Sequence, residues 1–183
     1  VGGLPKAVKT FVETHNVTAF RSVQDEIHEL YGVDASKYEE ENNKRLKIRR
    51  IYDMIPSSLE NKKKRIVIKD IEDKKWKRAE DYLEEFDYLI HSGVSLEVKA
   101  ISTPTYPLIG NSTKNLLKLY INDVGILSGV YYKNNIKAVM SDMNSINLGA
   151  VYETVVAQEL KAHGYNLYYY DNKKNGEVDF IID

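Results

Sequence analysis

Cysteine is absent from this 183-residue sequence, and so is any run of about 18 apolar residues. The first absence excludes disulfide bonds and metal sites built from thiolates. The second leads us to expect no membrane-spanning helix. Because a charged leader followed by apolar and small residues is also missing, we expect no secretory signal. We therefore expect a cytoplasmic protein.

Several catalytic motifs are also missing. No glycine pattern precedes Lys-Ser or Lys-Thr as a phosphate-binding loop requires, so the chain alone is not expected to hydrolyse ATP. There is no Gly-x-Ser-x-Gly nucleophile elbow and no thiol nucleophile. The four histidines lack metal-ligand spacing, and we interpret them as solvated or core residues: His15, His28, His91 and His163.

The net charge of −1 conceals a strong segregation of charge along the chain. Residues 44–78 hold 14 basic and 5 acidic side chains, whereas residues 1–43 hold 4 and 8, and residues 79–183 hold 8 and 14. DNA is therefore a candidate partner of the basic stretch. The candidate phosphate-contacting residues are Lys44, Arg45, Lys47, Arg49, Arg50, Lys62, Lys63, Lys64, Arg65, Lys74, Lys75, Lys77 and Arg78.

Two alternatives to nucleic-acid binding stay open for this basic stretch: a solvated surface, and docking to another protein domain. The exposed side of the helix expected over residues 76–92 carries carboxylates, which would repel phosphate: Asp81, Glu84, Glu85 and Asp87. Base-specific reading by this helix is therefore not expected. The basic residues at its start could still anchor a phosphate.

Hydrophobic periodicity predicts an α+β fold in three parts. Residues 1–41 form a helical lead-in, whose second helix is expected from about Ser22 to Gly32. Residues 42–130 have the pattern of a winged-helix-like module, and residues 131–183 that of the first part of an α/β domain. The expected elements are a basic helix interrupted at Pro56, a strand over 65–71, a helix with Trp76 in its apolar stripe over 74–93, strands over 94–101 and 116–123, a helix over 146–164, and a terminal hairpin.

Four acidic residues of the last part are candidate ligands of Mg²⁺: Glu153, Glu159, Glu177 and Asp179. On a helical wheel Glu159 lies inside the apolar stripe of its helix and Glu153 at the border. The strand that carries Glu177 and Asp179 is expected to be buried. The alternative is structural, because a core-facing glutamate can equally accept a hydrogen bond or pair with a nearby lysine or arginine.

Five segments together resemble one family, the functionally undefined C-terminal domain that follows the nucleotide-binding core in predicted bacterial and archaeal AAA+ superfamily ATPases. The segments are "VGGLPKAV", "LYGVDASKY", "KLYINDVGIL", "LGAVYETVVAQEL" and "LYYYDNKKNGEVDFII". The resemblance implies an upstream ATPase domain of the same protein that binds ATP. It also implies a winged-helix-like module and a terminal domain similar to the PD-(D/E)XK nuclease fold, also called restriction-endonuclease-like.

In the nuclease-like pattern, the acid of the first helix falls on Glu153 and the central acid falls on Asp179. The pattern then expects a strand with Glu-x-Lys, and the sequence ends before it. No catalytic set is therefore complete in this chain, which is expected to be inactive alone, and Mg²⁺ is the candidate metal of the intact parent. The first residue, Val1, and the last strand, which no turn follows, lead us to expect a fragment of a longer protein.

We interpret the chain as an accessory fragment of such an ATPase that contacts nucleic acid or a partner protein. Part of a Mg²⁺-dependent nuclease is one alternative, and a protein-interaction or regulatory module is another. An unpaired edge at residues 177–183 could also join two copies, so a homo-oligomer is a further candidate.

Overall fold

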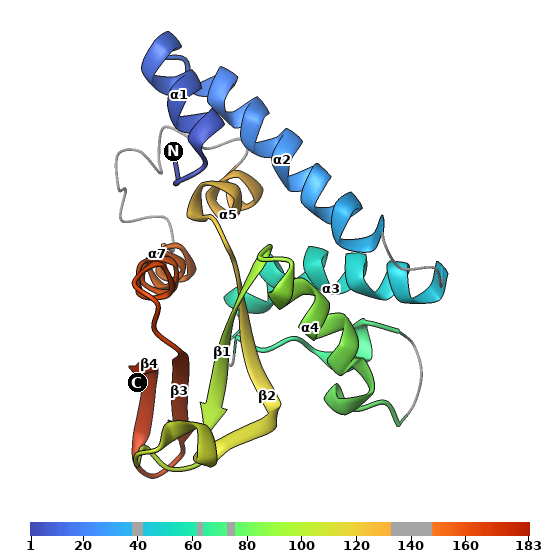
Figure 1. Ribbon diagram of the computed structural model, residues 1–183, viewed down its shortest axis with the longest axis vertical. Helices are drawn as coiled ribbons and strands as arrows, with labels where there is room; N and C mark the ends of the chain where they lie inside the picture. The colour runs from blue at the N-terminus through green and yellow to red at the C-terminus, as the bar shows by residue number, and fades with distance from the viewer. Residues whose placement is uncertain (38–41, 62–63, 73–75, 133–147) are drawn as a thin grey trace.

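A four-stranded sheet together with helices confirms the predicted α+β class (Figure 1). The computed structural model describes residues 1–37, 42–61, 64–72, 76–132 and 148–183. The strand order is β2-β1-β3-β4. The bounds are Ser95–Ile101 for β1, Ser112–Ile121 for β2, Leu167–Asn172 for β3 and Gly176–Ile182 for β4.

The sheet contains strands from both sides of the boundary expected at residue 130. β1 pairs antiparallel with β2, as the expected ribbon requires, and on its other side it pairs in parallel with β3. The terminal hairpin is confirmed, because β3 pairs antiparallel with β4. Between β2 and β3 lie α5 (Val124–Tyr131) and α7 (Gly149–Ala162).

The N-terminal helices are α1 (Pro5–Thr14) and α2 (Val17–Lys37). The predicted bounds of α2 were wrong at both ends. Asn16 starts the helix early, because its side chain accepts from the backbone N–H groups of Thr18 and Ala19. Gly32 does not end it but lies inside the helix, and the guanidinium of Arg49 occupies the place that a side chain at this position would take.

Helix α3 (Asn42–Glu60) continues through Pro56, where an interruption was predicted. Proline removes one hydrogen bond from a helix interior. Beyond it, however, Leu59 is fully buried, as is Ile55 just before it, and the hydroxyl of Tyr131 donates to the carbonyl of Pro56. The packing of this last turn offsets the local defect.

Residues 65–71 do not form the predicted strand. They contain a short 3-10 helix, η1 (Ile68–Asp70), and Ile71 is buried while its carbonyl accepts from the Arg50 guanidinium at 2.5 Å. The three adjacent apolar residues of this segment had blurred the two-residue period.

Within the described residues 76–93, the helix predicted over 74–93 begins at η2 (Ala79–Tyr82), which leads into α4 (Leu83–His91). The carboxylate of Asp81 accepts from the backbone N–H of Arg78 and so fixes this start. Trp76 was wrongly placed in the apolar stripe, because its side chain is 95% exposed and its φ is 78°.

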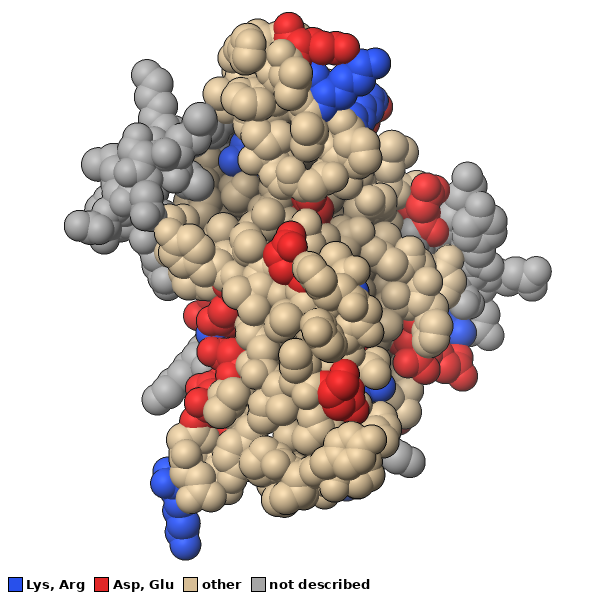
Figure 2. Space-filling view, turned by 60° about the vertical axis from the view of Figure 1, so that its left-hand side comes forward, with Lys and Arg blue, Asp and Glu red and all other residues tan. Residues whose placement is uncertain are grey.

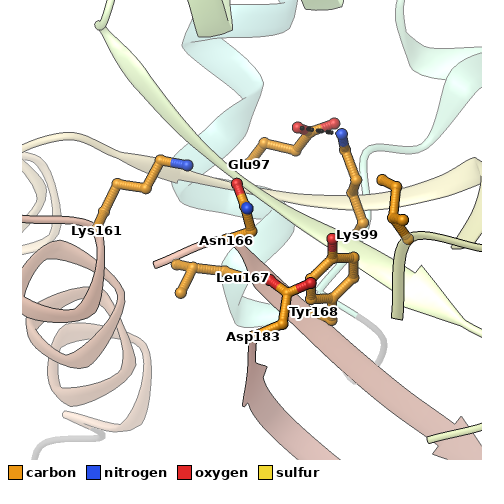
Figure 3. Close-up of a pocket in the computed structure, with 8 residues that line it drawn as sticks. Glu97, Lys99, Lys161, Asn166, Leu167, Tyr168 and Asp183 are labelled. Atoms are coloured by element: carbon orange, nitrogen blue, oxygen red, sulfur yellow. Dashed lines mark ion pairs between the residues drawn. The ribbon is translucent and has the colours of Figure 1, made fainter. Parts of the chain in front are cut away.

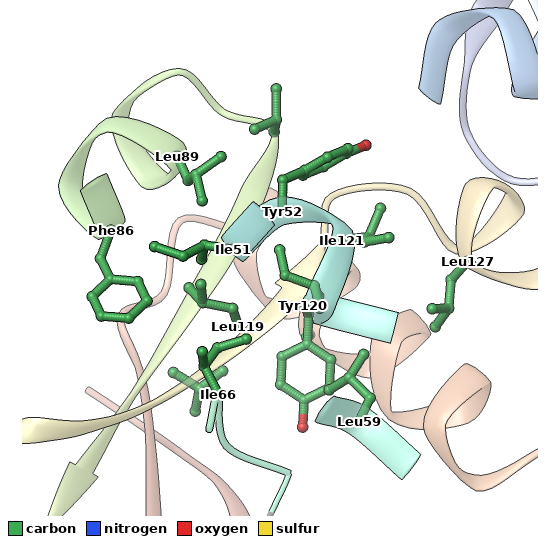
Figure 4. Packing of buried hydrophobic residues seen from close by; sticks show 14 of the residues in the cluster. Ile51, Tyr52, Leu59, Ile66, Phe86, Leu89, Leu119, Tyr120, Ile121 and Leu127 are labelled. Carbon is green, nitrogen blue, oxygen red and sulfur yellow. The ribbon is translucent and has the colours of Figure 1, made fainter. Parts of the chain in front are cut away.

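The main core lies between α3, α4 and the sheet (Figure 4). Its central side chains are Ile51 and Leu59 from α3, Phe86 and Leu89 from α4, and Leu119, Tyr120 and Ile121 from β2. Burying each such side chain stabilises the fold by about 1.5–3 kcal/mol. None of the helices within the described ranges is long and apolar enough to cross a membrane.

The N-terminal turn is held against the start of α5 by one buried carboxylate. Asp123 accepts from the backbone N–H of Ile126 at 3.0 Å and from that of Gly3 at 2.6 Å. Gln158 of α7 joins the same place by accepting from the backbone N–H of Val124 at 3.1 Å. Residues 1–3, α5 and α7 therefore meet at Asp123.

Gly125 should be irreplaceable at this junction. A Cβ there would lie 2.5 Å from the carbonyl oxygen of Val1 and 2.7 Å from Oδ1 of Asp123, whereas a Cβ at Gly110 would meet nothing within 4 Å. We expect Gly125→Ala to lower the free energy of unfolding by about 1–3 kcal/mol. Gly110→Ala, the matched control, should change it by less than about 0.5 kcal/mol. Urea unfolding of both variants measures the difference, and equal values would contradict the close packing at Asp123.

Candidate functional site

Charged and aromatic side chains gather on one face of the sheet. Side chains alternate along a strand, so Val98 and Ala100 of β1 share a face. Lys118 is paired with Val98, and Tyr169 with Ala100. Both therefore lie on this face.

The acids of the hairpin lie on the same face of the sheet. Asp171 follows Tyr169 by two residues, and Glu177 is its partner on β4. The face thus carries a lysine from β2 and carboxylates from the edge hairpin.

Lys118 is the centre of this site. Its side chain is 1% exposed, and its Nζ lies 3.1 Å from Oδ1 of Asp179 and 3.3 Å from Oε1 of Glu177. The same Nζ lies 4.5 Å from the centre of the Tyr169 ring, within the range of a cation–π interaction. The Lys118 side chain thus extends from β2 past the Tyr169 ring, and its ammonium contacts the carboxylates of β4.

Glu153 approaches the same face from α7. It forms an ion pair with Lys64, and its Oε2 accepts from the Tyr120 hydroxyl at 3.1 Å. Burial, followed by the negative charge of Glu153, raises the pKa of Tyr120. Asp179 and Glu177 act on it in the same direction. Tyr120 therefore stays protonated at neutral pH and donates to Glu153.

Arg65 holds the exposed end of the site. Its Nε donates to the hydroxyl of Tyr169 at 2.6 Å, and its guanidinium pairs with Asp171 at 3.2 Å. Burial raises the pKa of Tyr169, although the charge of Arg65 opposes the rise. This tyrosine hydroxyl is therefore an acceptor for Arg65 and not a source of negative charge.

Three of the four candidate metal ligands, Glu153, Glu177 and Asp179, are brought to this face. Within the described ranges, no group of three or more His, Cys, Asp or Glu side chains is arranged to hold a metal ion. Each of the three carboxylates instead contacts a lysine ammonium. A metal-binding role for them stays a prediction.

Glu159 lies outside the site, and its predicted place in the apolar stripe was wrong. Helix α7 buries the small side chains Ala150, Thr154 and Ala157, and Glu159 is exposed. The large residues of the predicted stripe are partly solvent-facing: Tyr152 is 56%, Val155 39% and Val156 42% exposed. Helix α7 thus turns its small residues toward the rest of the fold, and small side chains allow close packing.

The last strand was also predicted to be buried, and this was wrong. β4 is an edge of the sheet, and Val178 and Ile182 are 46% and 42% exposed. The side chain of Asp179 nonetheless does more than face solvent, because it forms an ion pair with the buried Lys118.

Lys118 itself was missed from the sequence, although a signal was present. It stands in "LLKLYI", where a lysine interrupts an otherwise apolar strand. A lysine is almost never fully buried unless it is paired. A buried lysine at this position would therefore predict carboxylates nearby, and these are Glu177 and Asp179.

The predicted phosphate-contacting residues are mostly engaged within the chain. Among the described residues, ion pairs join Lys44 with Glu84, Lys47 with Glu72 and Glu85, Arg49 with Glu29 and Asp53, Lys64 with Glu153, Arg65 with Asp171, and Lys77 with Asp81. Arg50 bonds the carbonyl of Ile71. Arg45 and Arg78 are within the described ranges, and Lys62, Lys63, Lys74 and Lys75 lie outside them.

The surface shows the same mixture of charges. On the face in Figure 2, basic side chains are few and scattered, and much of the area is uncharged. No continuous basic patch is visible on that face.

A separate pocket of about 260 Å³ lies where the ends of α7, β3 and β4 meet β1 (Figure 3). Its charged lining is mixed, with Glu97 paired to Lys99 at 3.2 Å, Lys161 opposite, and Asp183 beside Tyr168. Tyr168 and Lys99 are register partners and lie on the face opposite Tyr169 and Lys118. The pocket is therefore distinct from the Lys118 site.

Two family models match the chain. Residues 1–138 match a domain of unknown function (DUF8612), and residues 148–183 match another domain of unknown function (DUF4143). No curated protein matches the chain. No solved structure matches it either.

Removing the two carboxylates of the Lys118 site should lower the free energy of unfolding more than removing the ammonium does. In Glu177→Gln/Asp179→Asn the buried ammonium loses its partners, and we expect a loss of about 3 kcal/mol in the free energy of unfolding. In Lys118→Met the carboxylates, which are 45% and 40% exposed, can turn to water, and we expect a loss of only about 1 kcal/mol. Urea unfolding at neutral pH measures both. A larger loss in Lys118→Met would contradict the assignment of Lys118 as the desolvated partner.

Proposed function

We propose that this chain, which belongs to the DUF8612 family, is the accessory region of an AAA+ ATPase and acts by contacting protein. Two considerations support the ATPase context. The five segments quoted above resemble the region that follows an AAA+ core. The second matched family, DUF4143, is commonly found with AAA ATPases.

The ion pairing of the basic stretch carries the choice of protein over nucleic acid. Affinity for a duplex comes largely from cations that neutralise phosphates and release counterions. Six of the described candidates already contact carboxylates of the same chain. Each would have to exchange an internal partner for a phosphate, and the gain in affinity would be small.

The partner we propose is the ATPase domain of the same protein. The outer side of α7 presents Tyr152, Val155 and Val156 to solvent. The same helix approaches the N-terminal turn through Gln158. Its side-chain oxygen accepts from the backbone N–H of Val124, and its amide nitrogen lies beside Gly3, 3.2 Å from where a Cβ of that residue would be. A domain joined at this turn would lie beside the apolar side of α7.

Val155→Asp/Val156→Asp tests this contact in the full-length parent. Both side chains are partly exposed, so the fold should keep its melting temperature within about 3 °C. Charge placed in a docking surface should change the rate of ATP hydrolysis by about threefold or more. Val12→Asp, on the 62% exposed Val12 of α1, is the matched control and should leave the rate unchanged.

Unchanged hydrolysis in the α7 variant would contradict the docking contact. A parent gene without a phosphate-binding loop would contradict the ATPase context itself. Tight, steeply salt-dependent binding of a DNA duplex by the wild-type chain would overturn the choice of protein as partner.

A second candidate is a Mg²⁺-dependent nuclease assembled in the intact parent. The observation that favours it is that Glu153, Glu177 and Asp179 lie on one face of the sheet, although each is paired with a lysine and no three of the described acidic side chains are arranged to hold a metal ion. Glu153 and Asp179 are the positions at which the family resemblance places acids. If they bind Mg²⁺, it would activate a water molecule or stabilise the negative charge of the transition state.

Cleavage by the full-length parent tests the nuclease candidate. We would incubate it with single- and double-stranded DNA and with Mg²⁺ or Mn²⁺, and compare a folded Asp179→Ala variant. For a nuclease, cleavage should fall by about 100-fold or more in the variant. Intact DNA in the presence of a folded wild type would remove this candidate. The chain of residues 1–183 alone is expected to leave DNA intact.

A further inference from the structure

Four ion pairs join the two segments that match different families. Lys64 pairs with Glu153, Arg65 with Asp171, and Lys118 with both Glu177 and Asp179. In each pair the cation belongs to residues 1–138 and the carboxylate to residues 148–183. In these four pairs, residues 1–138 thus provide the positive charges and residues 148–183 the negative ones.

The three cations come from different parts of the fold to contact residues 148–183. Lys64 and Arg65 follow α3, whereas Lys118 stands in the middle of β2. Tyr169 lies between them, with Arg65 bonded to its hydroxyl and Lys118 against its ring. The three cations therefore contact an aromatic side chain together with carboxylates of residues 148–183.

Backbone pairing between the segments is short. The parallel ladder of β1 with β3 runs only from Lys99–Tyr168 to Ile101–Tyr170. By contrast, the β3–β4 ladder runs the length of the hairpin, from Leu167–Ile182 to Asn172–Gly176. The hairpin thus pairs with β1 over a shorter stretch than with itself. Side-chain contacts help to hold it in place, among them the buried Leu167 and Tyr169 in the core that β1 and β2 share.

We propose that Lys64, Arg65 and Lys118 form a docking surface whose partner is the acidic segment 148–183 of the same chain. The DUF8612 part is the receptor, the DUF4143 part is the ligand, and the two act as one unit. Lys118 is the buried anchor, and Lys64 and Arg65 are the partly exposed rim. This inference does not depend on the proposed ATPase context or on nuclease activity.

Charge reversal at the rim tests the docking surface in the full chain. Arg65 and Asp171 are suitable because their side chains are 20% and 33% exposed and tolerate exchange better than Lys118. The variants are Arg65→Asp, Asp171→Arg and the double variant. The measurement is amide hydrogen exchange of residues 167–182, followed by mass spectrometry at low salt.

Each single variant should place like charges together and speed this exchange by about threefold or more, and the double variant should restore it toward the wild-type rate. Exchange in α1 and α2 should not change. Lys9→Glu, which disturbs the exposed Lys9–Glu13 pair within α1, should leave residues 167–182 unchanged.

The neutral variants Arg65→Gln and Asp171→Asn replace the reversed ones if those fail to fold, and each should still speed the exchange of the hairpin. Raising the salt concentration should speed it in the wild type more than in the neutral variants, because salt screens partly exposed pairs. Unchanged hairpin exchange in the single variants would overturn the proposal. So would a double variant no better than either single one.

Discussion

The burial of the Lys118 ammonium is the constraint on which the arrangement of the site depends. With its side chain 1% exposed, the charge is tolerated only because Glu177, Asp179 and the Tyr169 ring surround it. Tyr169 lies on β3, two strands away across the sheet, and the two carboxylates lie on β4, three strands away. The need to neutralise one lysine of β2 therefore helps to hold the hairpin in place. Helix α7, which carries Glu153, is positioned by its own buried residues Ala150, Thr154 and Ala157.

Most elements could be predicted from the sequence where a single period was clear. The strand pair β1–β2, helix α7 and the terminal hairpin follow from local alternation and turn residues. The errors arose where a distant contact overrode local preference. Arg49 packs against Gly32 inside a helix, and the buried Leu59 keeps α3 helical beyond Pro56. The late start at η2 is instead local, because Asp81 accepts from the backbone N–H of Arg78.

The site was predictable in its acids and not in its cations. Four acids were predicted as a set of metal ligands, and three of them, Glu153, Glu177 and Asp179, lie on one face whereas Glu159 does not. Whether a metal or a basic side chain meets them depends on which residues a distant strand presents. Lys118 is 59 positions from Glu177, and Lys64 is 89 positions from Glu153. The basic stretch similarly looked free in the sequence because its partners, such as Glu29 and Asp171, come from other elements.

The shelter of the Lys118 ammonium can be measured directly by nitrogen-detected or proton-detected NMR of lysine side chains in the wild-type chain. Its three protons should exchange slowly with water and give a visible signal at neutral pH. Lys9, which is 74% exposed, should give none under the same conditions. The Lys118 signal should vanish in Glu177→Gln/Asp179→Asn. A Lys118 ammonium that exchanges as fast as that of Lys9 would contradict the central role given to this buried charge.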